Sequence, residues 1–296
     1  GTLESRQMDI IKVFPPIRVW GTVGFILAAW LVDFLEIGIT PNQFYVSAGA
    51  SFILGVYAFT LPRVGIQESS EKKTFVESLG LNAFALFKKK KIAIFLIFSM
   101  LLGCVLQISN MWGDGFLQDF RGEYPDSFVV KHSLVFISLS MVSEALFILA
   151  IPFFLKKFGI KKVMLLSMLA WVLRFAFFGI GDPGSGFIFL TLSMIIYGMA
   201  FDFFNISGSM FMAKESSPSI RSSAQGLFML MTNGLGAIIG AYGSGYIVDL
   251  YTGADGMKDW STIWYIFALY ALVVTIAFAL VFKYKHDPEE LGAVKH

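Results

Sequence analysis

Long apolar stretches alternate with short polar segments along almost the whole chain. Each apolar stretch contains 18 to 28 residues, and about 17 to 25 apolar residues are enough for an α-helix to cross a bilayer. The pattern predicts eight membrane-spanning helices, at residues 17–35, 43–61, 92–112, 128–155, 163–180, 187–212, 222–248 and 260–282. We therefore expect an all-α, polytopic membrane protein embedded in a lipid bilayer.

The polar segments between these stretches carry turn and loop signals. Pro15 and Pro16 suit the first turn of the first helix, where a missing N–H costs no hydrogen bond. Residues 113–127 are acidic and contain Gly and Pro, which predicts a loop after the third helix. Residues 156–162 contain four lysines and predict a very short basic loop between the fourth and fifth helices.

The seventh stretch, residues 222–248, is rich in glycine. Gly236 and Gly240 lie four residues apart and form a pair of small residues on one helix face. Such pairs let two helix backbones approach closely inside a membrane. We therefore expect this helix to pack tightly against a neighbouring helix.

Positive charge is distributed unevenly between the connections. Successive polar segments, counted from the N-terminal end, must lie on alternate sides of the membrane. The segments on the first side contain 18 Lys and Arg residues; they are residues 1–16, 63–91, 156–162, 213–221 and 283–296. The segments on the other side contain two, Arg121 and Lys258. Lys and Arg accumulate on the cytoplasmic side of membrane proteins, so both ends of the chain are expected in the cytoplasm. The run from Lys88 to Lys91 adjoins an apolar stretch and indicates a cytoplasmic membrane anchor rather than a nucleic-acid site.

The composition agrees with a membrane protein and narrows the possible partners. Hydrophobic residues make up 56% of the chain and charged residues 15%, whereas about a quarter of a soluble domain is charged. The net charge of +2 gives no indication of nucleic-acid binding. The one cysteine, Cys104, excludes an internal disulfide framework, and the three histidines show no metal-ligand spacing, so we expect no cofactor and no metal.

One apolar stretch carries an unusual set of polar residues. Tyr197, Phe201 and Asn205 follow one another at intervals of four and fall on one helix face, with Asp202 beside them. A carboxylate at the centre of a membrane helix costs about 2.5–3.5 kcal/mol on insertion scales, so it must face a protein interior or a wet cavity. We interpret this face as the wall of a solute pathway. The alternative is a structural Asp that pairs with a neighbouring helix.

Other spans contribute polar residues to the same predicted pathway, namely Arg18, Thr22, Gln107, Asn110, Glu144 and Asn233. Amides and hydroxyls suit an uncharged polar solute, and aromatic rings can stack on a flat base. A nucleoside combines a base with a polyhydroxyl sugar, although a sugar alone also fits this set. Arg18 has an alternative role as an anchor at the edge of its span, and Arg174 is expected to serve structure or helix pairing.

Glu144 and Asp202 are the candidates for proton coupling. Desolvation disfavours a charged carboxylate and a nearby cation favours it, so a carboxylate between these influences can take up and release a proton. Moving one charge through 100 mV yields about 2.3 kcal/mol, which is enough to drive accumulation of a solute. The alternative for Glu144 is a buried ion pair with a neighbouring helix.

Several segments together resemble one known family, the nucleoside:proton symporters of the major facilitator superfamily. They are residues 14–24, 80–88, 200–208 and 223–226, together with the second half of the basic loop at 156–162. The resemblance covers essentially the whole chain. It implies a bacterial inner-membrane importer with twelve helices in two halves that rock around a central site. We expect the transporter to be a monomer.

The resemblance assigns the eight expected helices to positions five to twelve of the family fold. Residues 1–62 would form the last two helices of the N-terminal half, residues 63–91 the central cytoplasmic loop, and residues 92–296 the C-terminal six-helix half. The first residue is Gly rather than Met, and the chain is expected to be a truncated member. A protein restricted to these 296 residues is predicted to be unable to transport alone.

The substrate positions implied by the resemblance fall on Arg18, Thr22, Gln107, Asn110, Glu144, Tyr197, Phe201 and Asp202. One departure from the family pattern is Met141, where a glutamine is expected one turn before Glu144. The loss of an amide beside the carboxylate bears on which nucleoside is preferred.

Three other functions remain as alternatives to nucleoside:proton symport. A sugar or polyol symporter of the same fold predicts competition by sugars that lack a base. A membrane receptor or scaffold predicts that neutralising Glu144 or Asp202 leaves function intact. A membrane-embedded enzyme would need a metal cluster or a nucleophile beside a base within the spans, and the sequence shows neither, so no enzymatic activity is expected.

Overall fold

The computed structural model describes residues 10–38, 40–61, 81–217 and 220–284, with only the backbone described at residues 10–18 and 81. The described residues form helices and connecting loops, without a β-sheet among them. The N-terminal helices are α1 (Ile10–Phe34) and α2 (Asn42–Ala58). The remaining elements are η2 (Leu81–Lys88), α4 (Lys90–Asp119), η3 (Phe120–Gly122), α5 (Phe128–Lys131), α6 (Ser133–Ile180), α7 (Phe187–Glu215), α8 (Arg221–Met229), η5 (Leu230–Gly236), α9 (Ala237–Leu250) and α10 (Trp260–Val281).

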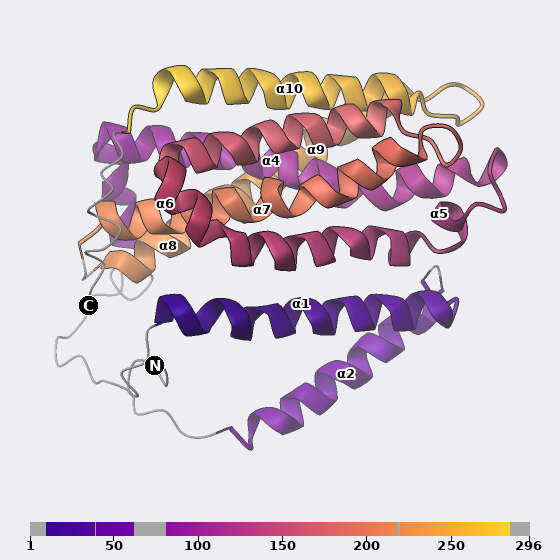
Figure 1. Ribbon diagram of the computed structural model, residues 1–296, viewed down its shortest axis with the longest axis horizontal. Coiled ribbons are helices and arrows are strands. Elements are labelled where there is room, and N and C mark those ends of the chain that lie inside the picture. Colours follow the sequence, from indigo (N-terminus) through magenta and orange to yellow (C-terminus); the bar gives the residue numbers. More distant parts are fainter. Residues whose placement is uncertain (1–9, 39, 62–80, 218–219, 285–296) are drawn as a thin grey trace.

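The long helices lie side by side in a bundle whose length follows the helix axes (Figure 1). α6 and α7 pack along each other and form the largest helix interface, and α10 packs on α6 on one side of the bundle. α1 packs on the N-terminal part of α6 on the other side. α2 lies outside α1 and has no buried residue, so it presents apolar side chains such as Phe44 and Phe52 at its surface.

Five helical segments in the described residues are long and apolar enough to cross a membrane, namely 90–122, 133–180, 187–215, 221–250 and 260–281. A shorter apolar helix, Val19–Phe34, is the part of α1 with described side chains. α2 is 17 residues long. Because a helix rises about 1.5 Å per residue, the 48 residues of α6 exceed twice the length of a single crossing.

Gly159 divides α6 into two helices. Its φ of 76° and ψ of 166° are non-helical and lie in a region that is essentially restricted to glycine. The chain therefore turns at one residue, and the lysines on either side remain helical. The sequence predicted a loop over residues 156–162 at this place; the structure shows a much shorter break.

The two largest shifts from the predicted helix boundaries are at the start of α1 and the end of α4. α1 begins at Ile10 instead of residue 17, because apolar residues continue upstream, and Pro15 and Pro16 therefore lie beyond the first turn. α4 continues to Asp119, through part of the predicted loop. Its extension is held by Phe116 and Leu117, whose side chains are buried in the core, and the apolar burial outweighs the low helix propensity of the glycines at 113 and 115.

Glycines allow α4 to touch the helix formed by η5 and α9. A Cβ atom added to Gly236 would lie 2.5 Å from the Met100 carbonyl oxygen, and one added to Gly240 would lie 2.7 Å from the Cα atom of Cys104. The close packing predicted from this glycine pair is therefore confirmed. On the opposing helix, a Cβ atom on Gly103 would overlap the Thr232 carbonyl oxygen.

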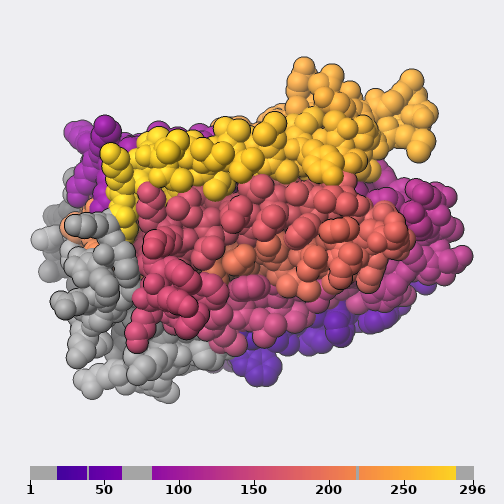
Figure 2. Space-filling view, turned by 45° about the horizontal axis from the view of Figure 1, so that its top comes forward, coloured from indigo at the N-terminus to yellow at the C-terminus, as the bar shows by residue number. Residues whose placement is uncertain are grey.

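Aromatic side chains fill much of the space between the helices. Trp264 and Phe175 are buried and pack with their ring centroids 5.4 Å apart, which joins α10 to the C-terminal part of α6. These two helices lie beside each other in the space-filling view (Figure 2). α10 begins at a defined point because the Asp259 carboxylate accepts a hydrogen bond of 3.1 Å from the backbone N–H of Thr262.

The two ends of the bundle are joined by different polar contacts. At one end Lys91 forms an ion pair with Glu215, which links the start of α4 to the end of α7. At the opposite end Asp33 of α1 lies 2.8 Å from His132, at the start of α6. A second contact in this region is the 2.8 Å hydrogen bond from Trp30 to the Ser138 hydroxyl.

Candidate functional site

α7 carries four of the residues that the sequence singled out. Tyr197 and Asp202 are buried, whereas Phe201 and Asn205 are half-buried. The rings of Tyr197 and Phe201 stack with centroids 5.9 Å apart and an angle of 6° between their planes. The Asn205 amide donates a 3.3 Å hydrogen bond to the Phe201 carbonyl oxygen. Residues spaced by four thus form a continuous aromatic and amide face.

A narrow crevice runs along this face. Its volume is about 20 Å³, enough for about one water molecule. Leu102 and Leu106 of α4, Trp171 of α6 and Thr232 of η5 contribute to its walls, beside Phe201, Asn205 and their neighbours on α7. The crevice therefore lies where α4, α6, α7 and η5 meet. Its volume is smaller than that of any nucleoside or sugar.

Glu144 is brought to the same region by the crossing of α6 and α7. A Cβ atom on Gly198 would lie 2.5 Å from the Ser143 carbonyl oxygen and 2.6 Å from the Glu144 backbone nitrogen, so the two helix backbones touch here. The Ser143 hydroxyl adds a hydrogen bond to the Ile195 carbonyl oxygen. Glu144 is 8% exposed and Asp202 is 0% exposed. The structure therefore places two buried carboxylates on adjacent helices.

Tyr197 lies within electrostatic range of both carboxylates and of the Arg174 guanidinium. Arg174 is buried in α6, and its carbon Cζ lies 4.6 Å from the centroid of the Tyr197 ring. Sequence reasoning assigned Arg174 to structure and helix pairing and did not place it beside the aromatic face. The signal that could have placed it there is its position inside a span, since a charged residue at this depth is usually functional.

The other predicted residues of α1 and α4 differ in their exposure. Thr22 of α1 is buried, Gln107 of α4 is half-buried and Asn110 of α4 is exposed. Among the side chains that the structure describes, neither amide of α4 forms a hydrogen bond with α7. Arg18 belongs to α1, but its side chain lies outside the described residues.

The element η5 was not expected from the sequence. It is a π-helix of seven residues between α8 and α9, and π-helical turns occur frequently at functional sites. Thr232 of η5 lines the crevice. Asn233, which the sequence placed in the pathway, is exposed, and its amide lies 3.4 Å from the sulfur of Met229.

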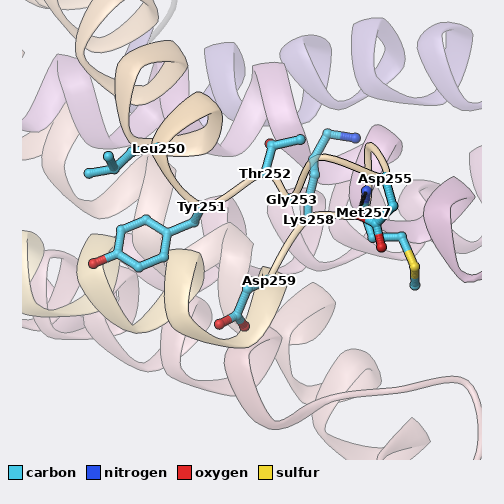
Figure 3. A pocket seen from close by; sticks show the side chains of 8 residues that line it. All are labelled: Leu250, Tyr251, Thr252, Gly253, Asp255, Met257, Lys258 and Asp259. Carbon is cyan, nitrogen blue, oxygen red and sulfur yellow. Dashed lines mark hydrogen bonds between the residues drawn. The ribbon is translucent and has the colours of Figure 1, made fainter.

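A larger hollow of about 470 Å³ lies at the end of the bundle, in the loop between α9 and α10 (Figure 3). All eight residues around it belong to one segment, from Leu250 to Asp259. The loop projects beyond the bundle (Figure 2). This hollow therefore belongs to a surface loop and does not include any predicted site residue.

Comparison with known proteins identifies the family. The family model described as nucleoside H+ symporter matches residues 3–287. The chain belongs to this family. It is therefore an all-helical, multi-pass membrane transporter of the major facilitator type, and its family is one of transporters rather than enzymes. In the described part of the chain, no group of three or more His, Cys, Asp or Glu residues could hold a metal ion.

Two curated relatives from Escherichia coli (strain K12) resemble this family member over nearly its whole length. The xanthosine permease is 54% identical over 99% of this chain and 71% of its own length. The nucleoside permease NupG is 52% identical over 96% of this chain and 68% of its own length. The maltose permease of Geobacillus stearothermophilus is more distant, with 24% identity over 79% of this chain.

Solved structures give the same result for the fold. The crystal structure of the nucleoside transporter NupG matches with a TM-score of 0.82 and 51% identity, over 96% of this chain and 70% of that one. A crystal structure of NupG with one aspartate replaced by alanine matches with a TM-score of 0.86, over 95% of this chain and 70% of that one.

Proposed function

We propose that this family member imports nucleosides together with protons, by alternating access across the bacterial inner membrane. The observation that carries the proposal is the cluster on α6 and α7, where the stacked rings of Tyr197 and Phe201 adjoin two buried carboxylates. Family membership supports the same substrate class and the same coupling ion.

Recognition of the nucleoside is assigned to rings and amides. Base stacking on an aromatic side chain contributes about 1–3 kcal/mol, and the half-buried ring of Phe201 is accessible for it. Asn205 and Gln107 each offer a donor and an acceptor to the base or to the sugar hydroxyls. Arg18, Thr22 and Asn110 are proposed to complete the set from α1 and α4.

Proton coupling is assigned to Glu144 and Asp202. Both side chains are almost completely buried, and burial disfavours the charged form of a carboxylate. Tyr197 lies within electrostatic range of both of them. Protonation of either carboxylate therefore changes the environment of the ring that is proposed to hold the base, and this provides a physical link between proton and nucleoside.

The topology proposed for the chain has eight crossings. The two parts of α6 on either side of Gly159 count as two, α8, η5 and α9 together count as one, and α2 is included with its 17 residues. Residues 1–62 are assigned to the N-terminal half of the transporter and residues 92–296 to the C-terminal half, joined by residues 63–91. We assign both ends of the chain to the cytoplasm, and the transporter acts as a monomer in this proposal.

The proposal is tested by uptake of labelled uridine into cells that express the complete gene, with and without a protonophore. Wild type is compared with Asp202→Asn, and Glu123→Gln is the matched control because Glu123 is an exposed carboxylate between α4 and α5. We expect both the protonophore and Asp202→Asn to abolish accumulation, and Glu123→Gln to retain it. Absence of uridine uptake by wild type present in the membrane, or competition by free ribose as strong as that by uridine, would contradict the proposal.

A further inference from the structure

Arg174 is a buried cation inside a membrane-spanning helix, and its contacts are unusual. It is 4% exposed. Its Nε atom donates a 3.1 Å hydrogen bond to the Ser109 hydroxyl, and one terminal nitrogen donates a 2.6 Å bond to the Ser193 carbonyl oxygen. Its guanidinium lies over two rings, 4.6 Å from the centroid of Tyr197 and 4.8 Å from that of Phe178. These contacts fix the guanidinium between α4, α6 and α7.

Tyr197 is held by three neighbours. The guanidinium of Arg174 packs against its ring, Trp171 meets it edge-on with centroids 5.8 Å apart and an angle of 86°, and Phe201 stacks parallel to it. Trp171 and Arg174 are three residues apart, so they project from the same side of α6. One face of α6 therefore determines the position of Tyr197.

We propose that Arg174 is a positioning residue for nucleoside binding that acts through Tyr197. The inference rests on the proposed function of the cluster. By fixing the Tyr197 ring, Arg174 fixes the orientation of its stacking partner Phe201, which lines the crevice. The same guanidinium supplies a positive charge to a region that contains Glu144 and Asp202.

The chemistry of the guanidinium explains why another cation is a poor substitute. It is planar, stacks on ring faces and presents several donors in a fixed arrangement. A lysine retains the charge but has a single flexible ammonium group and cannot stack as a plane. Arg174→Lys is therefore expected to loosen Tyr197 while it keeps the charge, and Arg174→Gln is expected to keep a planar donor group while it removes the charge.

The test is a double-mutant cycle in the purified full-length transporter, with the dissociation constant of uridine measured by calorimetry. We expect Arg174→Lys to weaken uridine binding roughly tenfold, the range of a desolvated cation–ring contact. In a Tyr197→Leu background the same substitution is expected to change binding less than about twofold, because the ring that transmits the effect is gone.

Control variants separate positioning from general stability. Ser109→Ala removes one hydrogen bond of Arg174 and is expected to weaken uridine binding about two- to threefold, again only when Tyr197 is present. Ser244→Ala removes the 2.8 Å hydrogen bond from Trp112, which joins α4 to α9. It is expected to lower the melting temperature and leave the dissociation constant of uridine unchanged.

The outcomes distinguish this inference from the proposed function. If wild type does not bind uridine, the proposed function fails. If wild type binds uridine but Arg174→Lys and Ser109→Ala bind it equally well, or weaken it by the same factor with and without Tyr197, then Arg174 has no positioning role. Should Arg174→Lys fail to fold, Ser109→Ala and its combination with Tyr197→Leu decide the question alone.

Discussion

At the residue scale, the stacked pair of Tyr197 and Phe201 differs from the many other ring contacts in this aromatic chain. Most buried rings, such as Phe95 and Trp264, belong to the hydrophobic core and stabilise the bundle. Phe201 is half-buried and lies next to Asn205. It stacks on Tyr197, which lies near the buried ionisable side chains of Arg174, Glu144 and Asp202. A ring with this combination of neighbours can interact with a base and respond to protonation.

Phe201→Ala is expected to raise the uridine concentration needed for half-maximal uptake roughly 5- to 150-fold, which corresponds to about 1–3 kcal/mol of lost stacking. The measurement is the concentration dependence of initial uptake in cells. Phe153→Ala is the control because Phe153 is 61% exposed and packs on Phe154, and it is expected to leave that concentration unchanged. Equal effects of the two substitutions would contradict a role of Phe201 in binding.

The sequence indicated part of this site and not the rest, for a physical reason. Helical periodicity relates Tyr197, Phe201 and Asn205 because they are neighbours on one helix. The proximity of Glu144 depends on how two helices cross, and that crossing is set by a glycine whose partner cannot be read from one sequence. The stacking of Arg174 on Tyr197 is likewise a contact between helices, although the burial of its charge could have suggested a role near the site.

At the element scale, helix crossings are governed by glycines that face another backbone. Gly198 fits against Ser143 and Glu144, and Gly236 fits against α4. The periodicity of apolar residues predicted the helical character of these segments, and five of the described segments are long and apolar enough to cross a membrane. It did not predict the π-helical segment η5, the single-residue break at Gly159 or the extension of α4, because each of these depends on packing or on local backbone geometry.

Gly198→Ala is expected to destabilise the protein by roughly 1–3 kcal/mol, because the new methyl group would overlap the α6 backbone. The melting temperature in detergent measures the effect. Gly243→Ala is the matched control, since a Cβ atom there would have no neighbour within 4 Å and alanine favours a helix. It is expected to be neutral or slightly stabilising. If both substitutions gave the same melting temperature, the crossing at Gly198 would not be as close as described.

The start of α10 gives a stability effect that depends on pH. Hydrogen bonds from Thr262 to the Asp259 carboxylate hold the pKa of Asp259 below its ordinary value. The charged Asp259 carboxylate therefore stabilises the folded protein at pH values above the pKa of an unfolded aspartate, about 3.9. This stabilisation is lost as the pH falls through the lower pKa that Asp259 has in the folded protein. Asp259→Ala is expected to cost about 1 kcal/mol at pH 7.

The pH dependence of the melting temperature tests this effect at the start of α10. The difference between wild type and Asp259→Ala is expected to be largest near neutral pH and to narrow below about pH 4. Asp259→Asn keeps an acceptor for the helix terminus and should retain most of the stability at neutral pH and below about pH 4. A difference between wild type and Asp259→Ala that stays constant from pH 7 to pH 3 would contradict a role of the charged carboxylate.

At the scale of the whole molecule, the crevice of about 20 Å³ is too small for a nucleoside. In the proposed mechanism, binding and release therefore require the helices around it to move apart. The contacts between α1 and α6, including Asp33 with His132 and Trp30 with Ser138, lie at the end of the bundle opposite the ion pair of Lys91 with Glu215. In alternating access, contacts at the two ends are expected to break in turn.

Cross-linking tests whether the contact between α1 and α6 opens during transport. In the full-length transporter, Asp33→Cys and His132→Cys together place two thiols where the native side chains lie 2.8 Å apart, while Cys104 is buried. A short, cleavable bifunctional thiol reagent is expected to abolish uridine uptake in the double variant, and cleavage of the reagent is expected to restore it. Each single variant treated in the same way should retain its own untreated uptake, because a one-ended reaction cannot hold two helices together. Full uptake by a completely cross-linked double variant would show that these helix ends stay together throughout the cycle, and opening would then have to occur between other helices.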